Sequence, residues 1–179
     1  MAKKTSEQTP QGLLTPLEAY KTAYQTRNLE IQLFWQRSNY FLVLNTAIVT
    51  GVALKLGSSD PLVGIFIAFG IFVSFLWYRV NLGSKFWQSR WEQTLHDLET
   101  ALSPSPKLFS ASREQIETEV RMSVQGSGND GWWRQFVNSS ILTKPSVSRH
   151  MLTLSVGFIC LYLALLVAWL IRLIWGNAA

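Results

Sequence analysis

The sequence predicts an all-α membrane protein with three transmembrane helices, two in a tight hairpin and one C-terminal, with cytoplasmic helical extensions. Of its 179 residues, 48% are hydrophobic and only 15% are charged, whereas a soluble domain normally carries about 25% charged residues. Charged residues are scarce in three long apolar runs of the sequence. Because lipid offers no partner for unpaired backbone groups, such runs are expected to be helices.

The chain divides into four predicted segments. A disordered polar tail is expected at 1–14, followed within 15–102 by an arm helix, a transmembrane hairpin and a cytoplasmic helix. Residues 103–149 are predicted to be a cytoplasmic helical and linker segment, and 150–179 the C-terminal transmembrane helix. No apolar run near the start resembles a cleaved secretory signal, so none is expected.

The first helix is predicted to start at "TPLE", Thr15 to Glu18, which has the form of a capping box with Pro16 at the first helical position. Nothing breaks the helix before Gly51, so the arm and the first apolar run, Tyr40 to Gly57, are expected to form one rod. The core of this run, about 17 residues, would span roughly 25 Å as a helix, which is enough to cross a bilayer.

The second apolar run, Pro61 to Val80, follows the short turn "GSSD", which is typical of a tight hairpin. Pro61 suits the first turn of a helix, where its missing N–H costs nothing. The small residues Gly64, Gly70 and Ser74 form a face that permits close approach of another helix.

The second helix is predicted to continue past the membrane as a short seam spaced by four, three and four residues: Trp91, Leu95, Leu98 and Leu102. Glu92, Asp97 and Glu99 are expected to lie off this seam. "SPSP" then ends the helix, because proline removes a backbone donor. A short amphipathic helix is expected to begin at Ser112, with Gln115 three residues on.

After the glycine-rich "GSGNDG", which is expected to be a linker, "WWRQFV", Trp132 to Val137, is predicted to be an interfacial segment on the membrane or on a partner helix. The third run, Met151 to Trp175, is the longest and most apolar. A soluble helix of this length would need a polar face, so this run predicts the C-terminal membrane crossing.

Basic residues predict the orientation, since they collect in cytoplasmic loops. Most of them lie in the N-terminal arm and between Arg79 and Arg149, whereas the hairpin tip has only Lys55 and the C-terminal end only Arg172. We therefore expect a bacterial inner (plasma) membrane protein with its N-terminus in the cytoplasm and its C-terminus outside.

The formal net charge of +5 does not favour nucleic acid, because no Lys/Arg run exceeds two residues and most basic residues alternate with acidic ones. Membrane lipids are the expected partners. The two histidines and Cys160 are far apart, and no phosphate-binding glycine pattern is present. No metal, cofactor or catalytic residue is therefore expected, and the chain is not expected to be an enzyme.

Three polar residues lie inside the first membrane run: Asn45, Thr46 and Thr50. One interpretation is a hydrogen bond within the hairpin, since an amide in hydrocarbon prefers a partner on another helix. The other is a polar line that faces an oligomer axis, as in a pore or gate. No run contains an acidic residue, which disfavours a proton relay.

Two aromatic stretches flank the predicted hairpin on its cytoplasmic side, "FWQRSNY" from Phe34 and "FWQSRW" from Phe86. They supply the candidate interface or lipid-belt residues: Trp35, Arg37, Trp87, Arg90 and Trp91. Aromatic rings suit the headgroup layer, and arginine suits anionic lipid. We interpret the likeness of the two stretches as adaptation to one environment rather than as a repeated site.

The stretches "RSNYFLVLNTAI", Arg37 to Ile48, and "LWYRVNLGSKFWQSRWEQTLHDLE", Leu76 to Glu99, resemble the RipA-like family of small oligomeric bacterial membrane proteins. The arm, hairpin and cytoplasmic helix, over about residues 20–102, also resemble SLATT-type membrane effectors of bacterial conflict systems. These resemblances imply a homo-oligomer and, for the effectors, perturbation of the membrane on a trigger. They carry over no site residues.

The resulting hypothesis is a non-enzymatic oligomeric membrane effector or pore-like module, controlled through its cytoplasmic helices and acting in phage defence. One rival is a scaffold or accessory subunit that anchors a soluble cytoplasmic partner encoded nearby. Another is a stress or pH adaptation factor of the RipA-like kind.

Overall fold

The structure, a computed structural model, describes residues 14–55, 57–58, 60–102, 107–124, 131–143 and 146–176. The predicted tail up to residue 13, the "SPSP" break at 103–106 and residues 126–130 of "GSGNDG" lie outside the described residues.

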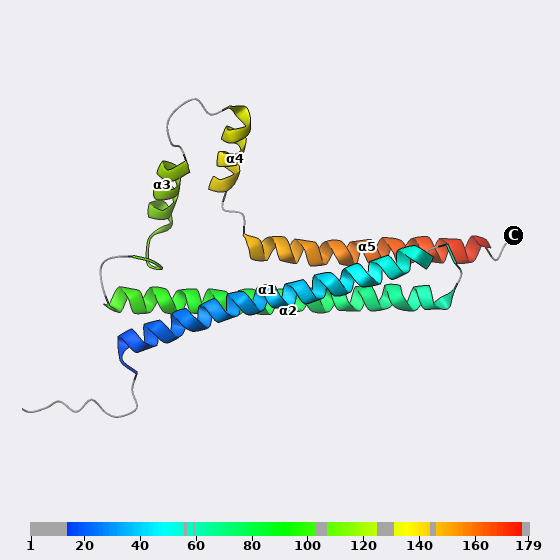
Figure 1. Ribbon diagram of the computed structural model, residues 1–179, viewed down its shortest axis with the longest axis horizontal. Helices are drawn as coiled ribbons and strands as arrows, with labels where there is room; N and C mark the ends of the chain where they lie inside the picture. Colours follow the sequence, from blue (N-terminus) through cyan, green and yellow to red (C-terminus); the bar gives the residue numbers. More distant parts are fainter. Residues whose placement is uncertain are drawn as a thin grey trace, which may run out of the picture.

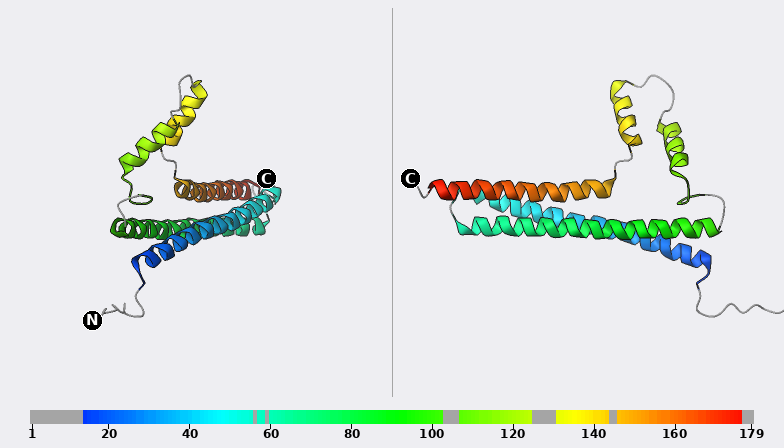
Figure 2. Two further views of the ribbon diagram at one scale, coloured as in Figure 1. Left: turned by 60° about the vertical axis from the view of Figure 1, so that its left-hand side comes forward. Right: turned by 180° about the vertical axis from the view of Figure 1, so that it is seen from behind.

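The described chain forms five helices: α1 Pro16–Lys55, α2 Pro61–Leu102, α3 Arg113–Val124, α4 Trp132–Leu142 and α5 Val147–Gly176. The two long helices α1 and α2 form an antiparallel hairpin, and α5 packs along the half of α2 nearest the hairpin tip (Figure 1). Helices α3 and α4 pack on each other and project sideways from this rod, at the end opposite the tip (Figure 2).

The buried side of α2 follows a heptad pattern over most of its length. Steps of four and three residues alternate through the buried positions Val63, Ile67, Gly70, Ser74, Trp77, Asn81, Ser84 and Gln88, and the same pattern reaches Leu95. This spacing keeps one seam facing a partner helix, as in left-handed coiled coils. The predicted seam from Trp91 onward is therefore the end of a longer one, although Leu102 is exposed.

Both predicted helix starts, at Thr15 and Ser112, are confirmed and have the bonds of a capping box. At the start of α1 the Thr15 backbone N–H donates to Glu18 Oε2 at 2.8 Å, and the Glu18 N–H donates back to Thr15 Oγ1 at 3.3 Å. Before α3 the Ser112 N–H donates to Gln115 Oε1 at 3.1 Å, and the Gln115 N–H donates to Ser112 Oγ at 3.2 Å. These reciprocal bonds satisfy backbone donors that a helix start leaves free.

Near the hairpin tip the core is apolar. Ile48 and Val52 of α1 pack with Val63 and Ile67 of α2, and Tyr162 of α5 joins the same cluster. The glycines of the predicted small-residue face of α2 contact α5, because a Cβ on Gly70 would clash with the Tyr162 ring. A Cβ on Gly64 would lie 2.7 Å from the Trp169 ring.

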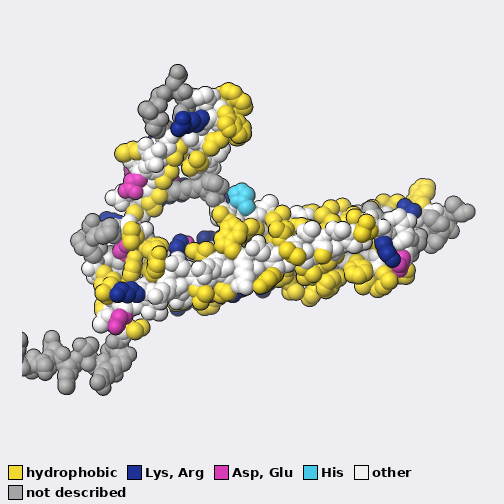
Figure 3. All heavy atoms as spheres, viewed as in Figure 1, with side chains coloured by type: hydrophobic (Ala, Val, Ile, Leu, Met, Phe, Trp, Pro, Cys, Tyr) yellow, Lys and Arg dark blue, Asp and Glu magenta, His cyan; other side chains and the backbone are white. Residues whose placement is uncertain are grey.

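An uncharged belt surrounds this half of the rod. The segments 40–54, 61–78 and 151–171 contain no charged residue, and hydrophobic side chains dominate their surface (Figure 3). Two of the described helices, α2 and α5, are long and apolar enough to cross a membrane. Helix α1 is not among them over its described residues, Pro16–Lys55.

Candidate functional site

The most buried polar group of the rod is a hydrogen-bonded node in which all three long helices meet. Asn45 of α1 and Ser74 of α2 are each 0% exposed, and Ser74 Oγ donates to Asn45 Oδ1 at 2.7 Å. Asn45 Nδ2 donates to the Phe41 carbonyl at 2.8 Å, and the Tyr162 hydroxyl donates to the Asn45 carbonyl at 3.0 Å. Every polar atom of the Asn45 side chain therefore has a partner within the subunit.

A polar seam continues from this node toward the α3–α4 end of the rod. Asn81 of α2 is 1% exposed, and its Nδ2 donates to the Met151 carbonyl of α5 at 3.2 Å. One heptad further, Ser148 Oγ donates to Gln88 Oε1 at 3.3 Å. The core thus changes along its length, from apolar near the hairpin tip to polar between Asn81 and Gln88, and it is apolar again at Leu95.

Two buried groups of the seam have no hydrogen-bond partner among the described residues: Ser38 Oγ and Trp77 Nε1. Ser38 is 2% exposed and Trp77 is 0% exposed. The Trp77 ring stacks on Phe41 with centroids 6.2 Å apart and also contacts Phe158 at 6.0 Å.

The three polar residues predicted in the first membrane run do not share one face. Asn45 is buried in the node, as the interpretation of a bond within the hairpin expects. Thr46 and Thr50 are exposed on the outside of α1, and each hydroxyl donates to the carbonyl four residues earlier, at 2.8 and 2.9 Å. Of the three residues, Thr46 and Thr50 therefore remain the candidates for a pore-facing position.

The two aromatic stretches lie at one level of the hairpin. The Arg27–Glu92 ion pair, at 3.6 Å, and the bond from Arg37 Nη1 to Ser84 Oγ, at 3.5 Å, join α1 to α2 at this level. Their environments differ, however, because Phe34 is 3% exposed and Phe86 is 64% exposed.

The candidate belt residues divide in the same way. Trp35 and Trp87 are exposed, and the Arg90 guanidinium lies 5.8 Å from the Trp87 ring centroid. Arg37 is half-buried against α2, and Trp91 is half-buried in the hairpin seam. Trp35, Trp87 and Arg90 are thus available to lipid or to another subunit, whereas Arg37 and Trp91 help to hold the hairpin together.

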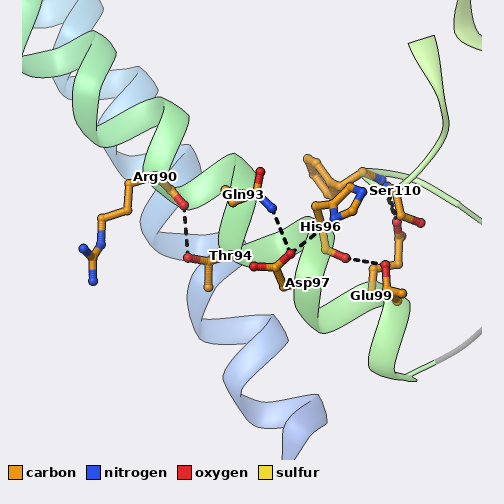
Figure 4. Close-up of polar contacts among 9 residues, drawn as sticks. Arg90, Gln93, Thr94, His96, Asp97, Glu99 and Ser110 are labelled. Carbon is orange, nitrogen blue, oxygen red and sulfur yellow. Dashed lines mark hydrogen bonds and ion pairs between the residues drawn. The ribbon is translucent and has the colours of Figure 1, made fainter.

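Glu99, predicted to lie off the seam, is 5% exposed because it holds the loop after α2. Its carboxylate accepts backbone N–H groups of Leu108 and Phe109 at 2.8 Å and of Ser110 at 2.7 Å. Figure 4 shows Ser110 beside the carboxylate. Burial opposes ionisation here, but the three backbone N–H bonds outweigh it, so the pKa of Glu99 lies below its ordinary value.

The same loop also docks on α1, and we call this double attachment the Glu99 latch (Glu99 with residues 108–110). The Phe109 ring meets Tyr24 edge-on at 6.3 Å, and the Arg27 guanidinium lies 5.4 Å from the Phe109 centroid. Burial, and next the negative charge of Glu99, raise the pKa of the nearby Tyr20. No sequence pattern signalled the latch, because its main partners are backbone groups about ten residues away.

The outer side of the same helix carries an ordinary solvated network. Asp97 Oδ1 accepts a hydrogen bond from Gln93 Nε2 at 2.8 Å and lies 3.4 Å from His96 Nδ1 (Figure 4). The described residues contain no group of three or more His, Cys, Asp or Glu side chains that would hold a metal ion.

These features define a class: a helical membrane protein built on a long antiparallel hairpin, with a third helix packed along it and a buried polar seam. A comparison with models of protein families identifies one family within this class. The model of the octameric membrane protein family (8xMP) matches residues 17–171, and the chain belongs to that family. It is thus an oligomeric membrane protein. No curated protein and no solved structure matched the chain.

Proposed function

We propose that the chain is a non-enzymatic subunit of a homo-oligomeric, pore-like assembly in the bacterial inner membrane. The observation that carries this proposal is the outer face of α1. In the uncharged belt of a subunit that belongs to an octameric family, Thr46 and Thr50 present hydroxyl groups outward. In a ring of subunits, one outward face of each lines the central axis.

The proposal includes a third membrane crossing by α1. Its uncharged segment 40–54 would span about 22 Å at 1.5 Å per residue, and Ser38 and Asn39 extend it by another 3 Å or so. That is shorter than the usual hydrocarbon thickness of about 30 Å, but local thinning and snorkelling accommodate such a difference. The contacts of Asn45 with Ser74 and Tyr162 keep α1 level with the belts of α2 and α5.

Three properties favour Thr46 and Thr50 as axis-facing residues. They lie one helical turn apart, they face away from α2 and α5, and a Cβ on the adjacent Gly51 would meet nothing within 4 Å. Each hydroxyl keeps a free acceptor site after bonding its own helix, as a water-lined surface requires. Because each hydroxyl already donates to a carbonyl of α1, Thr46 and Thr50 could also face lipid. The experiment below distinguishes a pore-facing α1 from a lipid-facing one.

An effector role in phage defence, with the N-terminal arm, the Glu99 latch and α3–α4 on the cytoplasmic side, extends this proposal. The resemblance of the arm and hairpin to SLATT-type effectors supports it. The Glu99 latch joins α1, α2 and the loop that leads to α3, so a signal received by α3–α4 has a direct mechanical route to the hairpin.

The test compares membrane depolarisation on overexpression for wild type, the double variant Thr46→Val/Thr50→Val and the control Thr153→Val. Valine keeps the shape and removes the hydroxyl. Thr153 is an exposed belt-edge threonine of α5 whose hydroxyl also bonds its own helix, at 3.0 Å. We expect wild type and the control to depolarise cells and the double variant to lose this activity while still inserting.

A scaffold that anchors a soluble partner is the second candidate, and the length of the hairpin favours it. From Arg79 to Leu102, α2 extends beyond the belt by about 35 Å at 1.5 Å per residue and forms a stalk with α1. A chain that never depolarises cells, with or without a trigger, would contradict the pore and favour this role. A stress or pH adaptation factor of the RipA-like kind would likewise conduct nothing.

A further inference from the structure

The largest cluster of exposed aromatic rings outside the rod lies on α4. Trp132 is 78% exposed, Trp133 62% and Phe136 58%, and Val137 and Ile141 continue the same face. Trp132 and Trp133 contact each other edge-on at 5.7 Å, and Trp133 stacks with Phe136 at 5.8 Å. These five residues form what we call the α4 aromatic face.

Nothing in the described part of the subunit covers this face. Helix α4 packs on α3, where Asn138 Nδ2 donates to the Val124 carbonyl at 3.3 Å. Asn138 lies on the side of α4 away from the aromatic face, since the apolar positions repeat at helical spacing. The α3 contact therefore fixes the helix and leaves its apolar side open.

The position of α4 indicates what covers the face. It ends at Leu142, and α5 begins at Val147, four residues before the uncharged belt starts at Met151. Four residues of helix correspond to about 6 Å along the axis, so α4 leaves the rod near the edge of the belt. In each view α4 runs crosswise to α5 (Figures 1 and 2). A helix crosswise to a membrane-spanning helix lies along the membrane surface.

The direction of the face agrees with this position. Hydrophobic atoms of α4 gather on the side that looks along the rod toward the belt (Figure 3). Tryptophan is enriched at membrane interfaces, because its ring is apolar and its N–H donates a hydrogen bond to water or to a headgroup. An interface with another protein subunit would not require this alignment with the belt.

We propose that α4 is an interfacial helix whose aromatic face lies in the lipid bilayer on the side where α5 enters it. The occupant of the face is the boundary between headgroups and acyl chains. With the Glu99 latch at one end and the membrane at the other, the α3–α4 pair connects the lipid surface to the end of the α1–α2 hairpin. This inference rests on α5 crossing the bilayer and does not depend on a pore.

The test places an NBD fluorophore on one cysteine of the full chain, at Trp133→Cys or, as a second site on the same face, at Phe136→Cys. The native Cys160 is first replaced by serine. The chain is reconstituted in nanodiscs of phosphatidylethanolamine and phosphatidylglycerol, with and without brominated acyl chains. Because an interfacial helix buries its apolar face by about 5–10 Å, we expect a blue-shifted emission and about twofold quenching by bromine.

The matched control is Gln135→Cys, which is exposed on the opposite side of α4 and is expected to show water-like emission and little quenching. A blue-shifted label at 133 without bromine quenching would show that a neighbouring subunit or another protein covers the face, and would overturn the proposal. Water-like emission at 133 and 136, or equal quenching at 135, would also overturn it. A chain that conducts nothing but shows the expected quenching would leave this inference standing while the pore fails.

Discussion

At the scale of single residues, Asn45 illustrates why a polar group inside a membrane run is ambiguous in sequence. An amide there either joins helices or faces a water-filled axis, and both interpretations satisfy its hydrogen bonds. The difference is the rotation of α1 about its own axis, which Ser74 and Tyr162 on two other helices determine. The sequence therefore identified the residue but not its direction.

Asn45→Leu is expected to lower the stability of the subunit rather than to affect conduction alone. It removes the acceptor of the Ser74 hydroxyl inside the core, and interhelical bonds in membranes contribute about 0.6 kcal/mol on average and up to about 1.7. Thermal unfolding in detergent micelles measures the effect. Thr46→Val, which removes an exposed hydroxyl bonded within its own helix, is the control and is expected to change stability little. Equal losses in both variants would contradict the node.

Glu99→Gln tests the Glu99 latch. The substitution removes the charge that three backbone N–H groups share, and hydrogen bonds to charged groups contribute about 1.5–3 kcal/mol each. We expect hydrogen exchange at the amides of Leu108, Phe109 and Ser110 to become at least about tenfold faster, since 1.4 kcal/mol corresponds to a factor of ten. Glu119→Gln on the exposed side of α3 is the control. Unchanged exchange at these three amides would show that the latch is not formed.

The latch also has a defined pH dependence. The pKa of Glu99 in the folded chain lies below the ordinary value of 4.5, so its contribution to stability is fully present above pH 4.5 and is lost as the pH falls through the folded value. Protease cleavage within residues 107–112 is expected to stay slow at neutral pH and to increase only below the ordinary carboxyl pKa. In Glu99→Gln the cleavage should be fast and nearly independent of pH. A wild-type transition near neutral pH would point to a different group.

At the scale of helices, the seam of α2 separates what was predictable from what was not. The helix starts, the continuity of both long helices and the small-residue face follow from local chemistry, so Thr15, Ser112 and Gly70 behave as predicted. The polar half of the seam was missed, because Asn81, Ser84 and Gln88 look like solvent positions until their heptad spacing is followed back into the membrane run. The role of Glu99 was not predicted, because its partners are backbone groups of a loop.

Gly70→Ala is expected to weaken the packing of α5 on α2. The added methyl would meet the Tyr162 ring, and overpacking of this kind typically costs about 1–3 kcal/mol. Gly83→Ala in the same helix is the matched control, since its Cβ would meet nothing within 4 Å. Alanine there should be neutral or stabilising by up to about 1 kcal/mol through helix propensity. Melting temperatures in one detergent compare the two, and a stabilising Gly70→Ala would contradict the α2–α5 contact.

At the scale of the whole molecule, the arrangement of the three long helices gives the rod two distinct ends. The hairpin tip and the end of α5 lie together, whereas the start of α1, the Glu99 latch and the α3–α4 pair lie at the other end (Figure 1). This polarity agrees with the distribution of basic residues, which predicts that the latch end is cytoplasmic. The uncharged segments of the three helices lie side by side between the two ends, and this alignment supports α1 as a third crossing.

The most direct measurement of this account is the side of the membrane on which each end of α1 lies. In a Cys160→Ser background, single cysteines at Lys21→Cys and Gly57→Cys report the exposed start of α1 and the exposed hairpin tip. A membrane-impermeant maleimide is applied to cells with a permeabilised outer membrane. We expect labelling of Gly57→Cys in intact cells and of Lys21→Cys only after the inner membrane is disrupted. Labelling of both positions under the same condition would place the two ends of α1 on one side and contradict the three-crossing subunit.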